Sequence, residues 1–128
     1  MSEIREDLLY TKTHEWVFVK NGTVRIGVTD FAQERMTDIV FVELPSLGTS
    51  FTKGDELAVI ESVKSVSEIY SPISGHISRI NESLENSPEL VNDSPFDEGW
   101  LVEMEIEESS QLHELLTYDT YLKLVKDQ

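Results

Sequence analysis

Lys64 lies in a stretch whose residue types would suit covalent modification of the lysine amine. The stretch reads ESVKSVSEIYSPISG (Glu61–Gly75), and the 128-residue chain contains only six lysines. Strand-forming residues end near Ser62 and begin again near Val66, which predicts a hairpin with Lys64 at or beside its tip. An enzyme that modifies one amine and rejects the others needs a lysine that protrudes in this way.

The neighbours of Lys64 are expected to leave it accessible on a stiff turn. Ser65 is small, as are the serines at positions 62 and 67, so the lysine side chain is uncrowded. Val63 and Val66 are expected to tuck under the turn and stiffen it. The alternative is an ordinary loop lysine that stays bare, in a module that only binds other molecules.

A second candidate group is the adjacent pair His14 and Glu15, which could in principle perform acid–base chemistry. A small hydrolase built on this pair is therefore one hypothesis. The sequence supplies neither a nucleophile nor a metal-binding constellation beside it, so His14 is interpreted as structural. The chain has no cysteine, which excludes disulfides, thiolate nucleophiles and cysteine metal sites. Any redox chemistry must therefore arrive on a cofactor.

The charge of the chain excludes some classes of partner. The formal net charge is −15, and the sequence pI is about 4.4. Such a surface repels phosphate backbones and anionic lipids, so neither nucleic acid nor a membrane is expected as a partner. The acidity favours docking to basic patches on other proteins, or it merely keeps an abundant protein from self-association.

Length and composition predict a single domain over residues 1–128, with 39% hydrophobic residues to form its core. No apolar run is long enough to span a membrane. The first residues, MSEIREDLLY, resemble neither a signal peptide nor a transit peptide. A cytoplasmic, monomeric protein is the expectation.

Strands dominate the predicted elements. The stretch EWVFVKNGTVRIGVT (Glu15–Thr29) alternates with period two around Asn21-Gly22, which predicts a hairpin whose two turn residues both have positive φ. Asp30 with Gln33 three residues later predicts a capped short helix near 30–36. Further strands are expected over 38–45, after a turn at 53–55, over 67–80 with a break near Pro72, and over 100–107.

The remaining segments are less regular. Residues 81–100 are polar with two prolines, which predicts mostly loop, with one helical turn at the start. Leucines from Leu112 onward have helical spacing, with Ser109 or Ser110 as the cap, so a C-terminal helix or two short ones are expected. Trp16, Tyr70 and Trp100 are interpreted as core residues or groove walls.

Several motifs in order along the chain resemble the H protein family of the glycine cleavage system. The likeness covers nearly the whole sequence. The motifs are YTKTHEW (Tyr10–Trp16), GVTDFAQ (Gly27–Gln33), DIVFVELPSLG (Asp38–Gly48), KGDELAVIESVK (Lys53–Lys64) and SPELVNDSPFDEGW (Ser87–Trp100). The flanks of Lys64 separate this family from lipoyl domains of 2-oxo acid dehydrogenases, which typically show Asp-Lys-Ala, and from biotin carriers with Met-Lys-Met.

The resemblance implies a mainly β fold, a flattened barrel-sandwich of two antiparallel sheets related to the lipoyl/biotinyl-type hybrid motif. It implies a cofactor carrier and not an enzyme, with lipoic acid joined covalently to Lys64 by an amide. The implied partners are the glycine decarboxylase (P protein), which loads an aminomethyl group, the tetrahydrofolate-dependent aminomethyltransferase (T protein), dihydrolipoamide dehydrogenase (L protein), and the lipoate ligase or lipoyltransferase that attaches the cofactor.

The resemblance also implies roles for other residues. Glu61, Val63 and Ser65 form the attachment turn, and Glu61 either helps the ligase position Lys64 or is merely exposed. Glu15 and Glu68 match carboxylates that are thought to hold the loaded, cationic arm and limit its contact with water. The alternative for both is that they are solvated surface acids.

One departure from the family pattern concerns the exit of the short helix. The family usually has Leu-Gly before Asp38, whereas this chain has Met36-Thr37. If the backbone there needs positive φ, the β-branched Thr37 is strained. A further alternative for the function is a lipoyl relay that donates lipoate to other lipoyl enzymes through the same Lys64.

Overall fold

Nine strands and five short helical segments make up the structure, a computed structural model that describes residues 2–128. The strands are β1 (Leu9–Tyr10), β2 (Glu15–Lys20), β3 (Thr23–Val28), β4 (Ile39–Glu43), β5 (Ser50–Phe51), β6 (Glu56–Ser62), β7 (Val66–Tyr70), β8 (Gly75–Ile80) and β9 (Val102–Ile106). The helical segments are α1 (Asp30–Met36), α2 (Ser83–Asn86), α3 (Leu90–Asp93), the 3₁₀ segment η1 (Ser109–Glu114) and α4 (Tyr118–Lys126). The prediction of a mainly β fold is confirmed.

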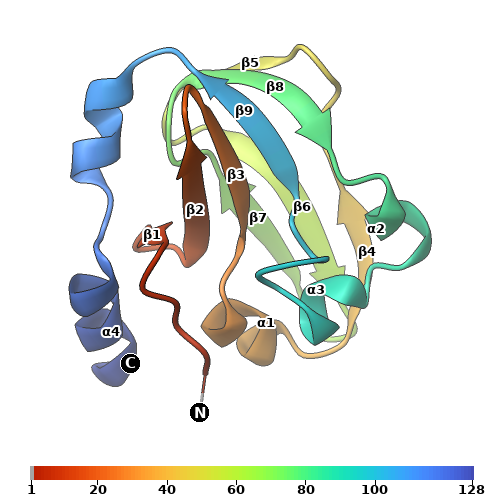
Figure 1. Ribbon diagram of the computed structural model, residues 1–128. Coiled ribbons are helices and arrows are strands. Elements are labelled where there is room, and N and C mark those ends of the chain that lie inside the picture. The colour runs from red at the N-terminus through yellow and green to blue at the C-terminus, as the bar shows by residue number, and fades with distance from the viewer. Residues whose placement is uncertain (1) are drawn as a thin grey trace.

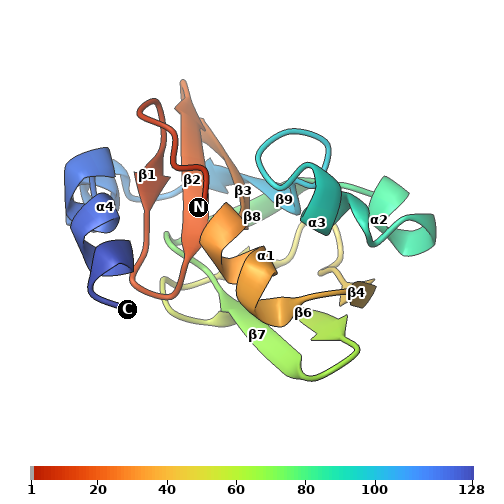
Figure 2. The same cartoon turned by 90° about the horizontal axis from the view of Figure 1, so that it is seen from below.

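The strands form two open antiparallel sheets packed as layers. The six-stranded sheet has the order β1-β2-β3-β9-β8-β5, and the three-stranded sheet has the order β4-β6-β7. Figure 1 shows the arrangement, and Figure 2 shows β7, β6 and β4 as a layer of their own along the lower edge of the view. The predicted sandwich of two antiparallel sheets is therefore confirmed.

The core lies between the two layers and follows from the period-two alternation of the strands. Val24 and Ile26 of β3 point into it from the six-stranded sheet, and Ile60 of β6 and Ile69 of β7 point into it from the three-stranded sheet; all four are at most 2% exposed. Burial of a large aliphatic side chain stabilises a fold by about 1.5–3 kcal/mol. This core fixes the register of β6 and β7, and with it the position of the turn that joins them.

The β2–β3 hairpin has the two-residue turn that the sequence predicts. Lys20 pairs with Thr23 across the turn. Asn21 has φ of 58°, but Gly22 is not in the positive-φ region, so the expectation of two positive φ angles is wrong. One positive-φ residue at the first turn position is enough to reverse the chain here.

The short helix α1 confirms the predicted element but corrects its cap. The Thr29 side chain accepts the hydrogen bond from the backbone N–H of Ala32, and Asp30 is the first helical residue. Asp30 instead accepts a hydrogen bond from Gln33 Nε2 at 2.7 Å. Thr29 and Asp30 are both good capping residues and differ by one position, which is why the pattern placed the cap one residue late.

Thr37 ends α1 with a positive φ, which is the condition under which the sequence departure predicts strain. Its φ is 61° and its ψ is −147°, a region populated almost only by glycine. The backbone N–H of Thr37 still donates to Gln33 O at 3.0 Å, and its hydroxyl donates to Met36 O at 2.6 Å. These two hydrogen bonds therefore hold the turn after α1 in this conformation in spite of the β-branched side chain of Thr37.

The C-terminal part forms two short helical segments, η1 and α4, as one of the two alternatives expected. The cap is Thr117, whose side chain accepts from the backbone N–H of Thr120, and not Ser109 or Ser110. Tyr121 of α4 is fully buried and stacks on Tyr10, with ring centroids 4.3 Å apart.

Other irregular parts of the chain differ in detail from the expectation. Residues 81–100 hold two one-turn helices, α2 and α3, where one was predicted. The turn at residues 53–55 is present, and Gly54 has φ of 94°. The two-residue strands β1 and β5 were not predicted, because two residues are too few to show a period.

Candidate functional site

The turn between β6 and β7 places Lys64 at its tip, as predicted. The backbone N–H of Ser62 donates to Ser65 O at 2.8 Å, and the N–H of Ser65 donates to Ser62 Oγ at 3.1 Å. The N–H of Val63 donates to Asp38 O at 2.9 Å, which ties the turn to the residue before β4. Lys64 itself is exposed. Figure 2 shows the turn projecting at the edge of the molecule.

The origin of the turn's stiffness differs from the expectation. Val63 is 71% exposed and Val66 is 60% exposed, so neither tucks under the turn. The hydrogen bonds of Ser62, Ser65 and Val63 close the turn instead. Because both valines beside the lysine are exposed, they are available for contact with another molecule.

Glu61 lies on β6 immediately before the turn. It is opposite Phe41 of β4 on one side and Val66 of β7 on the other. Residues directly opposite each other in antiparallel strands have side chains on the same face, so Glu61 lies between two exposed apolar side chains. This face is the outer face of the three-stranded sheet, because Ile60 points into the core.

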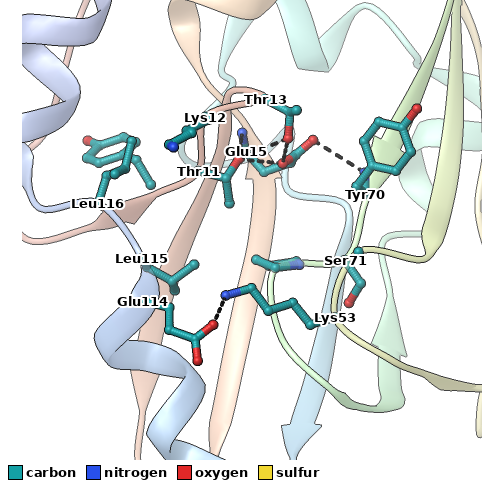
Figure 3. Close-up of a pocket in the computed structure, with 13 residues that line it drawn as sticks. Thr11, Lys12, Thr13, Glu15, Lys53, Tyr70, Ser71, Glu114, Leu115 and Leu116 are labelled. Atoms are coloured by element: carbon teal, nitrogen blue, oxygen red, sulfur yellow. Dashed lines mark hydrogen bonds and ion pairs between the residues drawn. The ribbon is translucent and has the colours of Figure 1, made fainter.

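Glu15, at the start of β2, is buried and only 1% exposed. Its Oε1 accepts hydrogen bonds from the hydroxyl groups of Thr11 and Thr13, the latter at 2.6 Å. Its Oε2 accepts a weak hydrogen bond from the backbone N–H of Tyr70 at 3.3 Å. Figure 3 shows these donors gathered around the carboxylate. The alternative of a solvated surface acid is wrong for Glu15.

Burial raises the pKa of Glu15 above its ordinary value of 4.5, and the hydrogen bonds from Thr11, Thr13 and the Tyr70 N–H oppose this rise. The three donors are neutral, so no positive charge of the protein compensates the carboxylate through them. A primary ammonium that came within hydrogen-bonding distance would stabilise the ionised form and lower the pKa again. The site is therefore suited to a cationic amine.

A cavity of about 490 Å³ lies beside Glu15. It is lined by Tyr10, Thr11, Lys12, Thr13, Glu15, Lys53, Gly54, Tyr70, Ser71, Pro72, Glu114, Leu115 and Leu116. The ion pair of Lys53 with Glu114 lies on the side of the cavity opposite Glu15 (Figure 3). Aromatic and leucine side chains supply much of the remaining wall, so the cavity offers both an apolar surface and a buried carboxylate.

Glu68 lies in a different hollow from Glu15. It is exposed on β7 and lines a groove of about 490 Å³ that runs between β7 and α1. The groove shares Lys12, Thr13 and Tyr70 with the cavity beside Glu15. The structure therefore places the two predicted carboxylates in neighbouring hollows along β7 and not in a single one.

His14 takes a structural position. Its Nδ1 lies 2.8 Å from the hydroxyl of Tyr121, which also lies 2.8 Å from Thr29 Oγ1. Burial lowers the pKa of His14 below its ordinary value of 6.5. Within residues 2–128, no hydrogen bond joins His14 to Glu15, so the pair does not form the acid–base dyad that the hydrolase hypothesis requires.

The aromatic residues confirm the interpretation as core or groove walls. Trp16 is 1% exposed, and its Nε1 donates to Pro95 O at 2.9 Å. Trp100 is buried beneath the guanidinium groups of Arg25 and Arg79. Tyr70 is partly exposed and lines both hollows beside β7.

Sequence reasoning missed the hydroxyl donors Thr11 and Thr13 and the wall supplied by Leu115 and Leu116. The spacing Thr-x-Thr-x-Glu in Thr11–Glu15 gave no usable signal, because this segment is a turn and not an extended strand: the backbone N–H of His14 donates to Thr11 O at 3.2 Å, and His14 has φ of 71°. The sequence gives no signal that links Leu115 and Leu116 to Glu15, because these leucines lie near the other end of the chain.

The described residues offer neither a metal site nor a membrane-spanning helix. No group of histidine, aspartate and glutamate side chains in residues 2–128 is arranged to bind a metal ion. None of the helices in this part of the chain has the length and hydrophobicity that crossing a bilayer requires.

Comparisons with known proteins agree along almost the whole chain. The family model described as Glycine cleavage H-protein matches residues 8–128. The glycine cleavage system H protein of Listeria monocytogenes serotype 4a is 49% identical over 120 residues, which cover 94% of this chain and 96% of the relative. That of Oceanobacillus iheyensis is 48% identical over 122 residues, which cover 95% and 97%.

A solved structure gives the same result in three dimensions. The crystal structure of a glycine cleavage system H protein from Mycobacterium marinum superposes with a TM-score of 0.83. Its sequence is 32% identical, and the match covers 94% of this chain and 97% of that one.

Proposed function

The chain belongs to the glycine cleavage H-protein family, whose role is that of a lipoyl carrier, and from this membership we propose that Lys64 is the residue that carries lipoate. The observation that carries the proposal is the exposure of Lys64 at the tip of a turn closed by backbone and serine hydrogen bonds. A ligase or lipoyltransferase reaches this amine without disturbing either sheet. Val63 and Ser65 flank the amine, and Glu61 precedes them on the last part of β6.

Lipoate attached through an amide would supply the dithiol that takes the aminomethyl group from the glycine decarboxylase, gives it to the tetrahydrofolate-dependent aminomethyltransferase, and is reoxidised by dihydrolipoamide dehydrogenase. The chain itself contains no thiol that could compete for disulfide exchange. Its own contribution is to present Lys64 to each enzyme in turn and to shelter what Lys64 carries between visits. The protein is in this proposal a carrier component and not an enzyme.

Glu15 and Glu68 are proposed to hold the arm from the two hollows beside β7. From Val66 to Tyr70 the strand extends about 13 Å from the Lys64 turn. Glu68 borders the groove along this path, and the buried Glu15 lies at its far end, hydrogen-bonded to the Tyr70 N–H. Glu15 supplies a carboxylate for an ammonium group, and the surrounding walls limit access of water.

The carrier role is tested with Lys64→Arg in a reconstituted glycine cleavage assay. Arginine keeps the positive charge but cannot form the amide, so glycine-dependent NAD reduction should fall to background. Lys20→Arg is the matched control, because Lys20 is an exposed lysine at the end of β2, and it should keep full activity. Activity that survives Lys64→Arg would overturn the proposal.

A further inference from the structure

Three positive side chains of this acidic chain lie around one hollow on the outer face of the six-stranded sheet. The hollow has a volume of about 480 Å³, and Lys20, Arg25 and Arg79 line it. Among the described residues that line it, Glu103 is the only acid. The whole chain has 25 acids against 10 lysines and arginines, so the sign of the charge is locally reversed at this hollow.

The pairing register of the strands builds the hollow. One row across β2, β3, β9 and β8 consists of Phe18, Arg25, Glu103 and Arg79. The residues that flank this row on β3 and β9 are mostly buried in the core, so the side chains of the row point outward. Lys20 follows Phe18 by two positions on β2 and therefore lies on the same face. Cations from three different strands thus border one hollow.

Arg25 is held in a fixed orientation at the hollow. Its Nε donates to Glu103 Oε2 at 2.8 Å, and its Nη2 lies 2.6 Å from the same oxygen. The guanidinium carbon lies 4.4 Å from the centroid of the buried Trp100 ring. A guanidinium that is stacked and paired in this way loses little freedom when a ligand binds, so Arg25 is a preorganised positive charge.

The other two cations have donors to spare. The guanidinium carbon of Arg79 lies 5.2 Å from the Trp100 centroid, and its Nη1 lies 3.5 Å from Glu103 Oε2. Within residues 2–128 this guanidinium makes no hydrogen bond, and the side chain is 60% exposed. Lys20 is exposed and takes part in no ion pair with this part of the chain. Both side chains are therefore able to bind an added anion.

The acids near the hollow leave its charge positive. Glu103 is a single carboxylate that both Arg25 and Arg79 approach. The next acid on this face of β9 is Glu105, which lies 2.9 Å from His76 Nε2 and does not line the hollow. Three cations against one carboxylate give the lining residues a formal charge of +2.

The charge of the rest of the chain favours a small ligand over a large one. A net charge of −15 repels an acidic protein or a nucleic acid that approaches any face. A small anion inside the hollow interacts mainly with charges within about 8 Å, because salt screens the more distant ones. The volume of the hollow also lies within the range of small-molecule sites, about 300–1,000 Å³.

We propose that this hollow is a binding site for a small multivalent oxyanion, one that carries phosphate groups or several carboxylates, and that Arg79 and Lys20 are its principal ligands. A guanidinium binds such oxygens through two parallel N–H donors, and an ammonium adds a compact charge. The site goes beyond the carrier role and does not depend on it. Figure 2 shows its strands in the upper layer and the turn of Lys64 at the lower edge of the view.

The test is an NMR titration of isotope-labelled, lipoylated protein at low ionic strength, with pyrophosphate as the phosphate probe and citrate as the carboxylate probe. Backbone amide signals of Asn21 and Thr23, which line the hollow, should shift and saturate, with a dissociation constant (Kd) of about 1 mM or less for at least one probe. Saturation with only one probe identifies which oxyanion the site takes. Signals that do not saturate with either probe would overturn the proposal.

A pair of double variants separates a defined site from general attraction of anions. Lys20→Gln with Arg79→Gln should raise Kd about tenfold or more, because it removes the principal charge-assisted hydrogen bonds. Lys123→Gln with Lys126→Gln is the matched control, since both lysines are exposed on α4, line no part of the hollow and change the net charge equally. Equal Kd values for the two double variants would overturn the site.

Discussion

The carboxylate of Glu15 accepts a hydrogen bond from the backbone N–H of Tyr70, at 3.3 Å and across 55 positions of sequence. Tyr70 is the last residue of β7, and the first residue of β7 follows the Lys64 turn. A single strand therefore runs from the proposed attachment site to a buried acid. This relationship is the structural basis for proposing that Glu15 holds the far end of the arm.

Glu15→Gln should leave lipoylation of Lys64 intact but shorten the lifetime of the loaded carrier. Glutamine keeps an oxygen for Thr11 and Thr13 but has no charge for an ammonium group, so loss of one charge-assisted hydrogen bond should shorten the lifetime about tenfold. The measurement is release of formaldehyde and ammonia from isolated loaded protein, with Glu85→Gln as the control. Equal release from wild type and Glu15→Gln would contradict the assignment.

The buried acid should also give a defined pH dependence of stability. Because burial raises the pKa of Glu15, the folded state binds the proton more tightly than the unfolded state in the window that begins near 4.5 and extends upward. Glu15 therefore lowers the free energy of unfolding as pH rises through that window. The difference in this free energy, wild type minus Glu15→Gln, should grow as pH falls from about 7 and level off near the ordinary value.

Chemical denaturation of both proteins at a series of pH values checks this sign. If the difference in unfolding free energy stays constant with pH, or grows as pH rises, burial does not destabilise the ionised carboxylate of Glu15 in the folded protein.

Much of the fold and the position of Lys64 could be predicted because they depend on local patterns. Alternation over Glu15–Thr29 and on both sides of Lys64 specifies strands, and the small residues between them specify turns. The burial of Glu15 could not be predicted in this way. Thr11 and Thr13 are near it in sequence, but Tyr70, whose N–H donates to it, is brought there by the sheet topology. Leu116, which lines the same cavity, is brought there by the pairing of the C-terminal segment with Tyr10 of β1.

Two wrong predictions from the sequence each have a physical reason. The cap of α1 was placed one residue late because Thr29 and Asp30 have nearly equal capping ability. Val63 and Val66 were expected to be buried because they are hydrophobic, but the turn is closed by hydrogen bonds and leaves both valines outside.

Thr37→Gly should stabilise the protein. Glycine removes the strain of a β-branched residue at φ 61° and ψ −147°, while it loses the hydroxyl hydrogen bond to Met36 O and gains backbone entropy in the unfolded state. The net gain should be about 1 kcal/mol, or a rise of about 4 °C in Tm. Thr37→Ala keeps the Cβ atom and should show no such gain. An unchanged or lower Tm for Thr37→Gly would contradict the strain argument.

Gly75→Ala should destabilise the protein severely. A Cβ atom at Gly75 would lie 2.1 Å from the backbone oxygen of Glu105 on β9, which cannot move without breaking the sheet. The loss should be about 3 kcal/mol or more. Gly22→Ala is the control, because a Cβ atom there meets nothing within 4 Å. Thermal unfolding of the two variants measures the contrast, and similar Tm values would contradict the close approach of β8 and β9.

The intact mass of protein from lipoate-replete cells, followed by peptide mapping, decides whether Lys64 carries lipoate. We expect a mass increase equal to one lipoyl group, located on the peptide that contains Lys64 and absent from the Lys64→Arg variant. A mature protein that supports glycine breakdown while Lys64 remains unmodified would contradict it.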